Sequence, residues 1–409
     1  MIAIYSPALT PQEMTPTLIH HSPEKATSTR IRHLAVIALL AGMLSVNASA
    51  ETLRWNVQNK YGITADGLRK AIQDAKGHFK KVPNDTMILE FDKGTFQVEG
   101  KDTDEGTIDL SGVSPGPQGR LVFQGAGMDK TVLVFSDNIA AIYGRNVFRV
   151  TMADMHMTRS NYTVSQGIVV EATKGKLVLD IQEGFPTPAD LFDPASKQGR
   201  YLRRYTNSKT DPQLVVKDNA QIPWRDAAPL GKRLWQINLL KKNSVPNYSK
   251  GDLIGIKSKR GGQAYWLMGG SDFIFNSVKW THKTRGVFRN SFDKIQILDC
   301  VTDRAAPVAG QTPCLASPEG GPQIGQPWDP PTTGNIVKNC QFTASGDDAV
   351  AFFHATGEIS GCQIHDAFAR GILLANSAET LLRDNSFLRC AVQNTKDHKL
   401  PTTPPDLID

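Results

Sequence analysis

The sequence has little of what marks several common classes of protein. It has no lysine-rich run and no basic helix, which argues against nucleic acid as a partner. After residue 80, apolar residues rarely recur at helical spacing, which favours an all-β fold over a mainly helical one. The five cysteines match no zinc-binding spacing. What the chain does have is 40% hydrophobic residues in 409, with 34 glycines and 24 prolines, which indicates a long core and many turns.

The first 50 residues have the pattern of a signal peptide. Basic residues at 30–33 precede a short apolar run at 34–46, and Ala-Ser-Ala at 48–50 supplies a small-residue cleavage site. The apolar run is too short to span a membrane. We therefore expect an exported protein, periplasmic or secreted, that begins near Glu51 and has no membrane span in its mature form. The alternative is an uncleaved membrane anchor.

The net charge is a small positive excess. It is +6 for the whole chain, and residues 1–50 carry three basic and two acidic residues, so their removal leaves +5. Such an excess suits an acidic polymer, but it is scattered along the chain, and we interpret it as a solvated surface.

A repeat occupies the last third of the chain. Aligned positions fall at steps of 24, 40, 22 and 23 residues, and the long step contains a Gly/Pro-rich loop at about 305–333; the positions are Asn276, Cys300, Cys340, Cys362 and Asn385. Short β-branched runs separated by Gly, Asn and Asp at a period of 22–24 are typical of stacked coils. The sequence therefore predicts an all-β fold, a right-handed parallel β-helix whose coils share one core.

The residues in the aligned column should form ladders, because stacked coils lie about 4.8 Å apart. We expect Cys300, Cys340 and Cys362 to be buried small apolar residues rather than redox or catalytic thiols. We expect Asn276 and Asn385 to bond the backbone at turns.

The rest of the chain can be divided around this repeat. An amphipathic segment, Ile63–Lys76, predicts a helix that caps the open end of the coils, with Thr64 or Asp66 as its N-cap. The pattern breaks between 179 and 256, where alternating segments predict an inserted β-rich module. The predicted division is a signal peptide region at 1–50, coils with the capping helix at 51–178, the inserted module at 179–256, catalytic coils at 257–390 and a polar, Pro-containing tail at 391–409.

The segment Ser345–Phe353 holds two adjacent aspartates, Asp347 and Asp348. Neighbouring side chains of a strand face opposite ways, which would bury one carboxylate in the coil at a high cost. Gly346 lets the backbone turn, so that both can face a cleft. Two close carboxyls ionise at different pH values, which suits one as acid and the other as base. The alternative is that Gly-Asp-Asp is only a turn.

The run from Gly346 to Val350 (GDDAV), set in β-helix coils, resembles the pectin-lyase-like glycoside hydrolases, including polygalacturonases (family 28) and α-1,3-galactosidases (family 110). The inserted module makes the layout more similar to family 110. The Asn-Thr-Asp motif of polygalacturonases is matched by Val301-Thr302-Asp303 only at Asp303, and their Gly-His-Gly and Arg-Ile-Lys motifs are missing, which argues against pectin as substrate.

The resemblance implies inverting hydrolysis of a polysaccharide or oligosaccharide, in which one carboxylic acid protonates the glycosidic oxygen and another activates water. The expected catalytic residues are Asp347 and Asp348, with Asp303 as a third. The expected substrate-binding residues are Arg370, His354, Trp328 in the Gly/Pro-rich loop, and Glu379 or Asp384 one coil after the aspartates. His354 is also interpretable as a structural residue.

Two other functions remain open from the sequence. A polysaccharide lyase would use Arg370 as base and hold calcium on Asp347 and Asp348. A β-helix without catalysis, binding carbohydrate only, is also compatible with the fold. No cofactor is expected for the hydrolase, and calcium only for the lyase.

Overall fold

The computed structural model describes residues 50–101, 103–191, 201–216, 221–240, 248–257, 262–282, 285–395 and 407–408. The predicted signal peptide and most of the predicted tail lie outside these residues. Within the described part, none of the helices combines the length and the apolar character that crossing a membrane requires.

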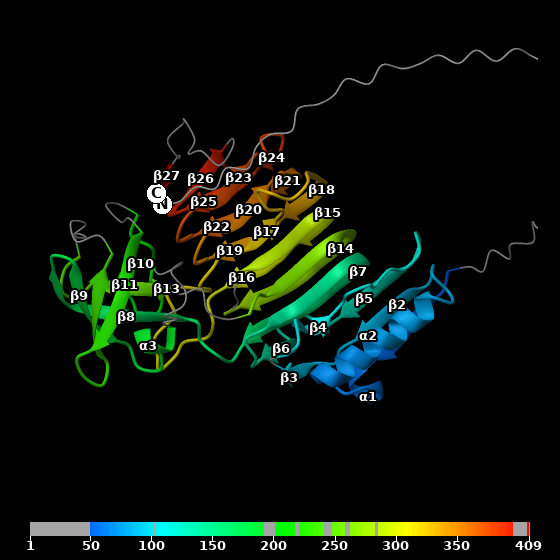
Figure 1. Ribbon diagram of the computed structural model, residues 1–409, viewed down its shortest axis with the longest axis horizontal. Helices are drawn as coiled ribbons and strands as arrows, with labels where there is room; N and C mark the ends of the chain where they lie inside the picture. The colour runs from blue at the N-terminus through cyan, green and yellow to red at the C-terminus, as the bar shows by residue number, and fades with distance from the viewer. Residues whose placement is uncertain are drawn as a thin grey trace, which may run out of the picture. The chain divides into compact units, whose positions relative to one another are not determined.

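Parallel strands wind through successive coils, stacked in chain order from the N-terminal helix to β26 (Figure 1). The longest strands bend and continue from one face of a coil to the next. The first face contains β4 (Gly106–Asp109), the opening parts of β7 (Ala140–Arg159), β14 (Tyr265–Thr281) and β15 (Gly286–Leu298), then β17 (Pro322–Ile324), β20 (Val350–Phe353), β23 (Ile372–Ala375) and β26 (Cys390–Thr395).

The two remaining faces continue the same winding. The second contains β1 (Thr52–Asn56), β2 (Thr86–Glu90), β5 (Arg120–Gln124), later parts of β7, β14 and β15, then β18 (Thr332–Lys338), β21 (Ala355–Ser360) and β24 (Leu381–Arg383). The third contains β3 (Gly94–Val98), β6 (Thr131–Phe135), the ends of β7 and β14, then β16 (Val301–Asp303), β19 (Gln341–Thr343), β22 (Gln363–His365) and β25 (Ser386–Leu388). A short β27 (Leu407–Ile408) pairs antiparallel with β26. The predicted all-β, parallel β-helix fold is confirmed.

The corners of the coils explain the turn residues of the repeat. Asp299, Asn339, Gly361 and Asp384 occupy the same corner of successive coils, and each has a positive φ, between 51° and 63°. Glycine adopts this left-handed conformation freely, and Asn and Asp tolerate it better than other residues. The column of Gly, Asn and Asp therefore marks where each coil turns from its second face to its third.

Inside that corner the predicted cysteine ladder is present. Cys300, Cys340 and Cys362 are buried free thiols, and the Sγ of Cys340 lies 3.3 Å from the carbonyl oxygen of Ile297 on the preceding coil. The hydrogen bond with Cys340, and next burial, raise the pKa of the Cys362 thiol, and the pKa of Cys340 is raised as well, so neither thiol is activated. Asn385 takes the next place and bonds the backbone as expected, accepting from the Cys362 N–H at 2.9 Å.

The N-terminal end of the core is covered by helix α2 (Ala65–Phe79), which follows a short α1 (Val57–Lys60). Thr64 is the N-cap, since its hydroxyl accepts from the Gly67 N–H at 3.1 Å. The apolar face of α2 is fully buried in the same cluster as the coil interior. The predicted capping helix is confirmed, with Thr64 rather than Asp66 as its N-cap.

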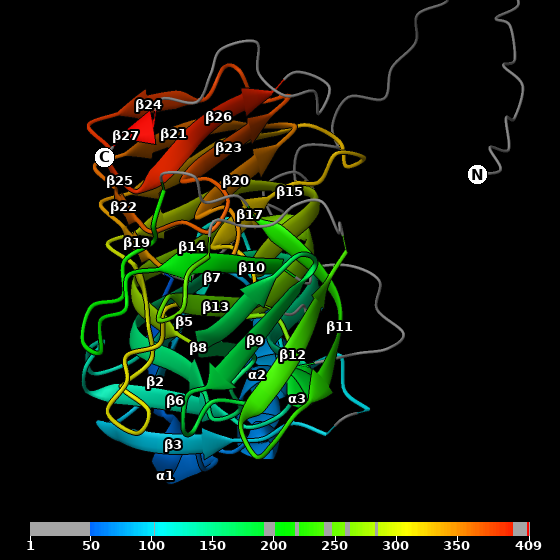
Figure 2. The ribbon, with the colours of Figure 1, turned by 90° about the vertical axis from the view of Figure 1, so that its left-hand side faces the viewer.

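The inserted module is a closed antiparallel barrel. Its strands are β8 (Val164–Thr173), β9 (Lys176–Ile181), β10 (Tyr201–Tyr205), β11 (Ile222–Pro229), β12 (Leu234–Leu239) and β13 (Leu253–Lys257), and a short α3 (Pro188–Leu191) lies between β9 and β10. These strands form a group beside the coils in Figure 1, and they lie in front of the coils in Figure 2. The barrel begins at Val164, whereas the sequence predicts the module from 179. The difference arises because β8 has a coil-like apolar pattern but pairs with β9 and β13.

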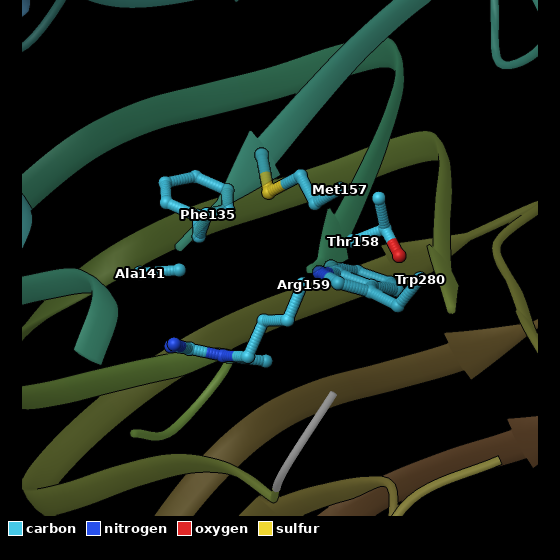
Figure 3. Close-up of a pocket in the computed structure, with 7 residues that line it drawn as sticks. Phe135, Ala141, Met157, Thr158, Arg159 and Trp280 are labelled. Atoms are coloured by element: carbon cyan, nitrogen blue, oxygen red, sulfur yellow. The ribbon is translucent and has the colours of Figure 1, made fainter. Parts of the chain in front are cut away.

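Arg159 binds the backbone at the point where the chain leaves the coils for the barrel and returns from it. The guanidinium donates to the carbonyl oxygens of Ile139 and Gln263, at 2.6 and 3.2 Å, and pairs with Asp137. Beside it lies an interior cavity of about 10 Å³, drawn in Figure 3, between Arg159, Phe135 and Trp280. A cavity of this size holds no more than about one water molecule, so it is a packing gap and not a substrate site.

Candidate active site

The two adjacent aspartates lie in the loop that leads into β20, between two neighbouring coils. One coil earlier, Gly320 lies beside Asp348, with its amide neighbour Gly321 donating to the Asp348 carbonyl at 3.0 Å. One coil later, the Arg370 carbonyl accepts from Ala349 N at 2.9 Å. The loop is therefore held by backbone bonds on both sides.

Gly346 is required here by a close approach and not by a left-handed turn. A Cβ at this position would lie 2.1 Å from the Ser317 carbonyl oxygen of the preceding coil. The residue is not among the glycines with positive φ in the described part of the chain. The interpretation of Gly346 as a turn glycine is thus corrected: it lets the coils stack closely just where both carboxylates face outward.

Each aspartate is paired with a cation from a different region. Asp348 receives a two-pronged contact from Arg370 of the following coil, with Nη2 donating to Oδ2 at 2.9 Å and Nε donating to Oδ1. Asp347 Oδ2 lies 3.3 Å from Nζ of Lys257, the last residue of barrel strand β13. The catalytic pair of the sequence prediction is therefore brought together, with Arg370 beside it.

The environments of the two carboxyls differ. The Asp347 side chain is 36% exposed and the Asp348 side chain 12%. Burial, and next the neighbouring Asp347 carboxylate, raise the pKa of Asp348 to about 6, although Arg370 opposes the rise. One group is thus poised to carry a proton in mildly acidic solution beside a more accessible carboxylate.

Both aspartates line a cleft of about 290 Å³ on the outer side of the first face. Its floor follows one register column, from Gln323 through Ala351 to Leu373. Ala351 lies in the middle of this column, so the floor is lowest next to the aspartates. The other residues in its wall include Arg285, Gln326, Pro327, Phe353 and Arg370.

Glu319 is a carboxylate that sequence reasoning missed. It lies one coil before Asp347, because the next residue, Gly320, packs against Asp348. Its side chain is 11% exposed, and Oε2 lies 3.0 Å from Nε of Arg285, which lines the cleft. The long loop between β16 and β17 hid it, since its 28-residue distance from Asp347 departs from the 22–24 period.

Asp303 does not lie among the residues that line the cleft. It ends β16 on the third face, and its Oδ1 accepts from the Arg304 N–H at 2.7 Å. The prediction placed it by the match of Val301-Thr302-Asp303 to the Asn-Thr-Asp motif, but the loop that follows β16 contacts the barrel, where Cys314 N donates to Gln166 Oε1 at 2.6 Å, before it reaches the cleft. Glu319 does not line the cleft either, but it pairs with a lining residue, Arg285.

The predicted binding residues Trp328 and His354 lie near the cleft edge. Trp328 is 70% exposed and directly follows Pro327 of the cleft wall, with the Arg289 guanidinium 5.6 Å from its ring centre. His354 follows Phe353, but its ring bonds inside the protein, with Nε2 2.6 Å from the Asn376 amide and Nδ1 3.3 Å from the Asp329 carbonyl. Trp328 remains a binding candidate, and His354 fits the structural interpretation.

Glu379 and Asp384 are not brought to the cleft. Glu379 is exposed in the turn between β23 and β24, and Asp384 is exposed at the corner after β24. Both corners belong to the second face, whereas the cleft opens on the first. The coil position of a carboxylate depends on its place within the period, which spacing from the Asp pair alone could not determine.

The residues present do not fit calcium. Asp347 and Asp348 are already compensated by Lys257 and Arg370. In the described ranges, no three acidic or metal-ligating side chains come together in a group that could hold an ion. Calcium takes six to eight oxygen ligands, several of them carboxylates. The donor set therefore falls short of a calcium site.

Known proteins resemble the chain only distantly. No protein-family model and no curated protein matches the chain. Solved structures match it at low identity. One, described as Geobacillus virus E2 - ORF18, has a TM-score of 0.43 at 12% identity over 90% of this chain and 53% of its own. A catalytic domain of GH87 α-1,3-glucanase in complex with nigerose has a TM-score of 0.37 at 10% identity, over 84% and 48%.

A third structure, pectate lyase Bsp165PelA from Bacillus sp. N165 in complex with trigalacturonate, has a TM-score of 0.30 at 9% identity, over 88% of this chain and 89% of its own. The chain spans about half the length of the first two structures. The parallel β-helix fold of the chain follows from its own strand pairing, and we take neither activity nor substrate from these likenesses.

Proposed function

We propose that the protein is an exported glycoside hydrolase that cleaves an extracellular polysaccharide or glycan with inversion, using Asp347 and Asp348. The observation that carries the proposal is the pair itself: two neighbouring carboxyls share one cleft, and each has its own cation and its own degree of burial. A simple turn would need neither the cleft nor a buried lysine from another region.

Asp348 is the proton donor in this proposal. Its raised pKa, about 6, keeps part of the population protonated in mildly acidic solution. The more exposed Asp347 accepts a proton from the attacking water. Inverting enzymes hold their two carboxyl groups about 6.5–9.5 Å apart to leave room for that water. Glu319 supports the site through Arg285.

Trp328 supports the choice of carbohydrate as ligand. It is largely exposed beside the cleft wall, where an aromatic ring can stack on a sugar ring. The sequence resemblance to family 110 makes α-galactosides the first substrates to try. Export rests on the signal pattern of residues 1–50.

The lyase alternative receives less support from the residues of the cleft. Its proposed base, Arg370, is engaged by both oxygens of Asp348, and the donor set does not fit calcium. A lyase would release an unsaturated uronate, and a hydrolase would release a reducing sugar.

The test is product analysis of residues 51–409 with α-galactosides, an α-1,3-glucan, polygalacturonate and alginate. Asp347→Asn and Asp348→Asn should each lower kcat by about 10³-fold, as loss of a general acid or base does. Asp299→Asn makes the same change at an exposed coil corner, where Asn is tolerated, and should leave activity within about twofold.

Proton NMR of the first product formed gives the anomeric configuration, and inversion is the expected result. A product with retained configuration would correct the mechanism, and an unsaturated product would replace the hydrolase by a lyase. A folded protein that is silent on every substrate would leave a binding β-helix.

A further inference from the structure

Lys257 is the one lysine that the barrel contributes to the Asp pair among the described residues. It ends β13, whose register places it beside Val164 of β8 and Tyr201 of β10. Two neighbouring barrel strands therefore fix its backbone. Its position in space is set by the inserted module and not by the coils.

The side chain of Lys257 is buried, with 2% exposure. A buried ammonium is unfavourable unless its charge and its N–H groups are satisfied. Here Nζ donates to the Gly346 carbonyl oxygen and lies 3.3 Å from Asp347 Oδ2, and the Phe368 ring centre is 4.9 Å away. The cation thus has three partners in the coils, and the ring centre of Tyr201 in the barrel lies 5.5 Å away.

Two of these partners, Gly346 and Asp347, are consecutive residues of the catalytic loop. Holding the Gly346 carbonyl fixes the peptide that leads into Asp347, and pairing with Oδ2 fixes the direction of the Asp347 side chain. A carboxylate that is 36% exposed would otherwise be free to change rotamer. Lys257 itself does not line the cleft, so it acts on the reaction only through Asp347.

We propose that Lys257 is a positioning residue, by which the inserted barrel orients and charge-compensates the Asp347 carboxylate of the active site. The inference rests on the proposed hydrolase for its kinetic consequence, but its structural consequence holds without it. The barrel then contributes to catalysis through the position of Asp347, rather than serving only as an attached module.

Arg203 offers a matched control. It is a buried cation on barrel strand β10 that donates to a coil carbonyl, that of Phe368, and it has no contact with either aspartate among those described. Lys257→Met and Arg203→Met therefore each remove one buried barrel cation from the barrel–coil boundary. Only the first should affect Asp347.

The activity-independent measurement is the crystal structure of each variant. In Lys257→Met the Asp347 carboxylate should leave its present direction or occupy more than one rotamer, while in Arg203→Met it should stay in place. An unchanged Asp347 in Lys257→Met would overturn the proposal, whether or not the protein is a hydrolase. If Lys257→Met does not fold, Lys257→Gln, which still donates to Gly346, takes its place.

The kinetic measurement follows on a substrate cleaved by the wild type. Lys257→Met should lower kcat by about 100-fold with KM within about threefold and change the pH profile of kcat, and Lys257→Arg should recover part of the loss. Arg203→Met should keep the wild-type pH profile. Equal losses in both Met variants, with one common pH profile, would show a merely structural anchor. Absence of wild-type activity would refute the proposed function and leave the crystallographic result standing.

Discussion

The coil stack and the inserted barrel bury their apolar side chains in different ways. In the coils, parallel strands repeat, so each residue stacks on its equivalent one coil away, as Cys300, Cys340 and Cys362 do. In the barrel, antiparallel strands close on themselves, and no residue has such an equivalent. The coils therefore repeat a position, while the barrel can place a unique group such as Lys257. The active site uses both properties.

The largest expected effect is on the junction between the two regions. His282 follows β14 and accepts from the Thr163 N–H at 3.1 Å, just before the barrel begins. Its ring centre lies 3.9 Å from that of Tyr162, with the two ring planes tilted by 40°. Burial, and next the charge of Arg159, lower the pKa of His282 from 6.5 to about 4. The unfolded chain thus takes up the proton first as the pH falls from about 6.5 to about 4, so stability is lost over that window.

The loss from His282 should reach about 3 kcal/mol at the low end of the window, measured by urea unfolding at several pH values. His282→Asn, which retains an acceptor, should reduce the pH dependence, and His156, whose pKa burial also lowers to about 4, should keep the remainder. His365→Asn, a change on coil strand β22, should keep the wild-type slope. A wild-type slope in His282→Asn would show that the junction is not the acid-sensitive point.

The next effect concerns the third carboxylate. Glu319→Gln removes the carboxylate that pairs with the half-buried Arg285 at the cleft wall, and should lower kcat by about 100-fold. Asp303→Asn should change it by less than about threefold, because Asp303 lies outside the cleft. Steady-state kinetics of both variants decides whether Glu319 or Asp303 is the third carboxylate, and thermal unfolding checks that both variants are folded. A larger loss in Asp303→Asn would restore the assignment made from sequence.

The pH dependence of turnover is a smaller effect. If Asp348 donates a proton, kcat should fall about tenfold per pH unit above about pH 6, since the acid form is lost as pH rises through its pKa. Because Arg370 lowers that pKa, Arg370→Gln should move the alkaline limb to higher pH. A limb that stays in place, or moves to lower pH, would assign it to another group.

The smallest effect is on binding at the cleft edge. Trp328→Ala should raise KM by about three- to tenfold and leave kcat within about twofold, because it removes a stacking surface and no reacting group. Leu230→Ala removes an exposed apolar side chain from the barrel and should change neither constant. Equal changes in both variants would mean that Trp328 acts through solubility or folding.

The same contrast explains what sequence could predict. The period of the repeat predicted the coil corners, because Asn339 and Asp384 stand where the backbone is left-handed. The apolar face from Leu68 to Ala75 predicted the capping helix. The aspartates were found because two adjacent carboxylates are costly in a strand.

The remaining parts of the site depend on contacts between distant segments. Lys257 and Gly346 are 89 residues apart, and no periodic pattern connects them. The only local signal for Lys257 is a lysine at the end of the apolar strand Leu253–Lys257, where a buried charge needs a partner. Glu379 and Asp384 were placed by spacing, but a few residues of displacement along a coil move a side chain to another face.

The column of buried thiols makes the separation of neighbouring coils measurable by chemical labelling. All five cysteines are buried and free, and three of them share one corner of neighbouring coils. A thiol-reactive dye cannot reach that column while the coils are stacked, so the labelling rate reports how often neighbouring coils separate. The barrel's core cluster contains none of the five thiols, but Cys314 packs with Val164, Tyr205 and Leu253 of the barrel, so the opening of the coils is measured from the three column thiols alone.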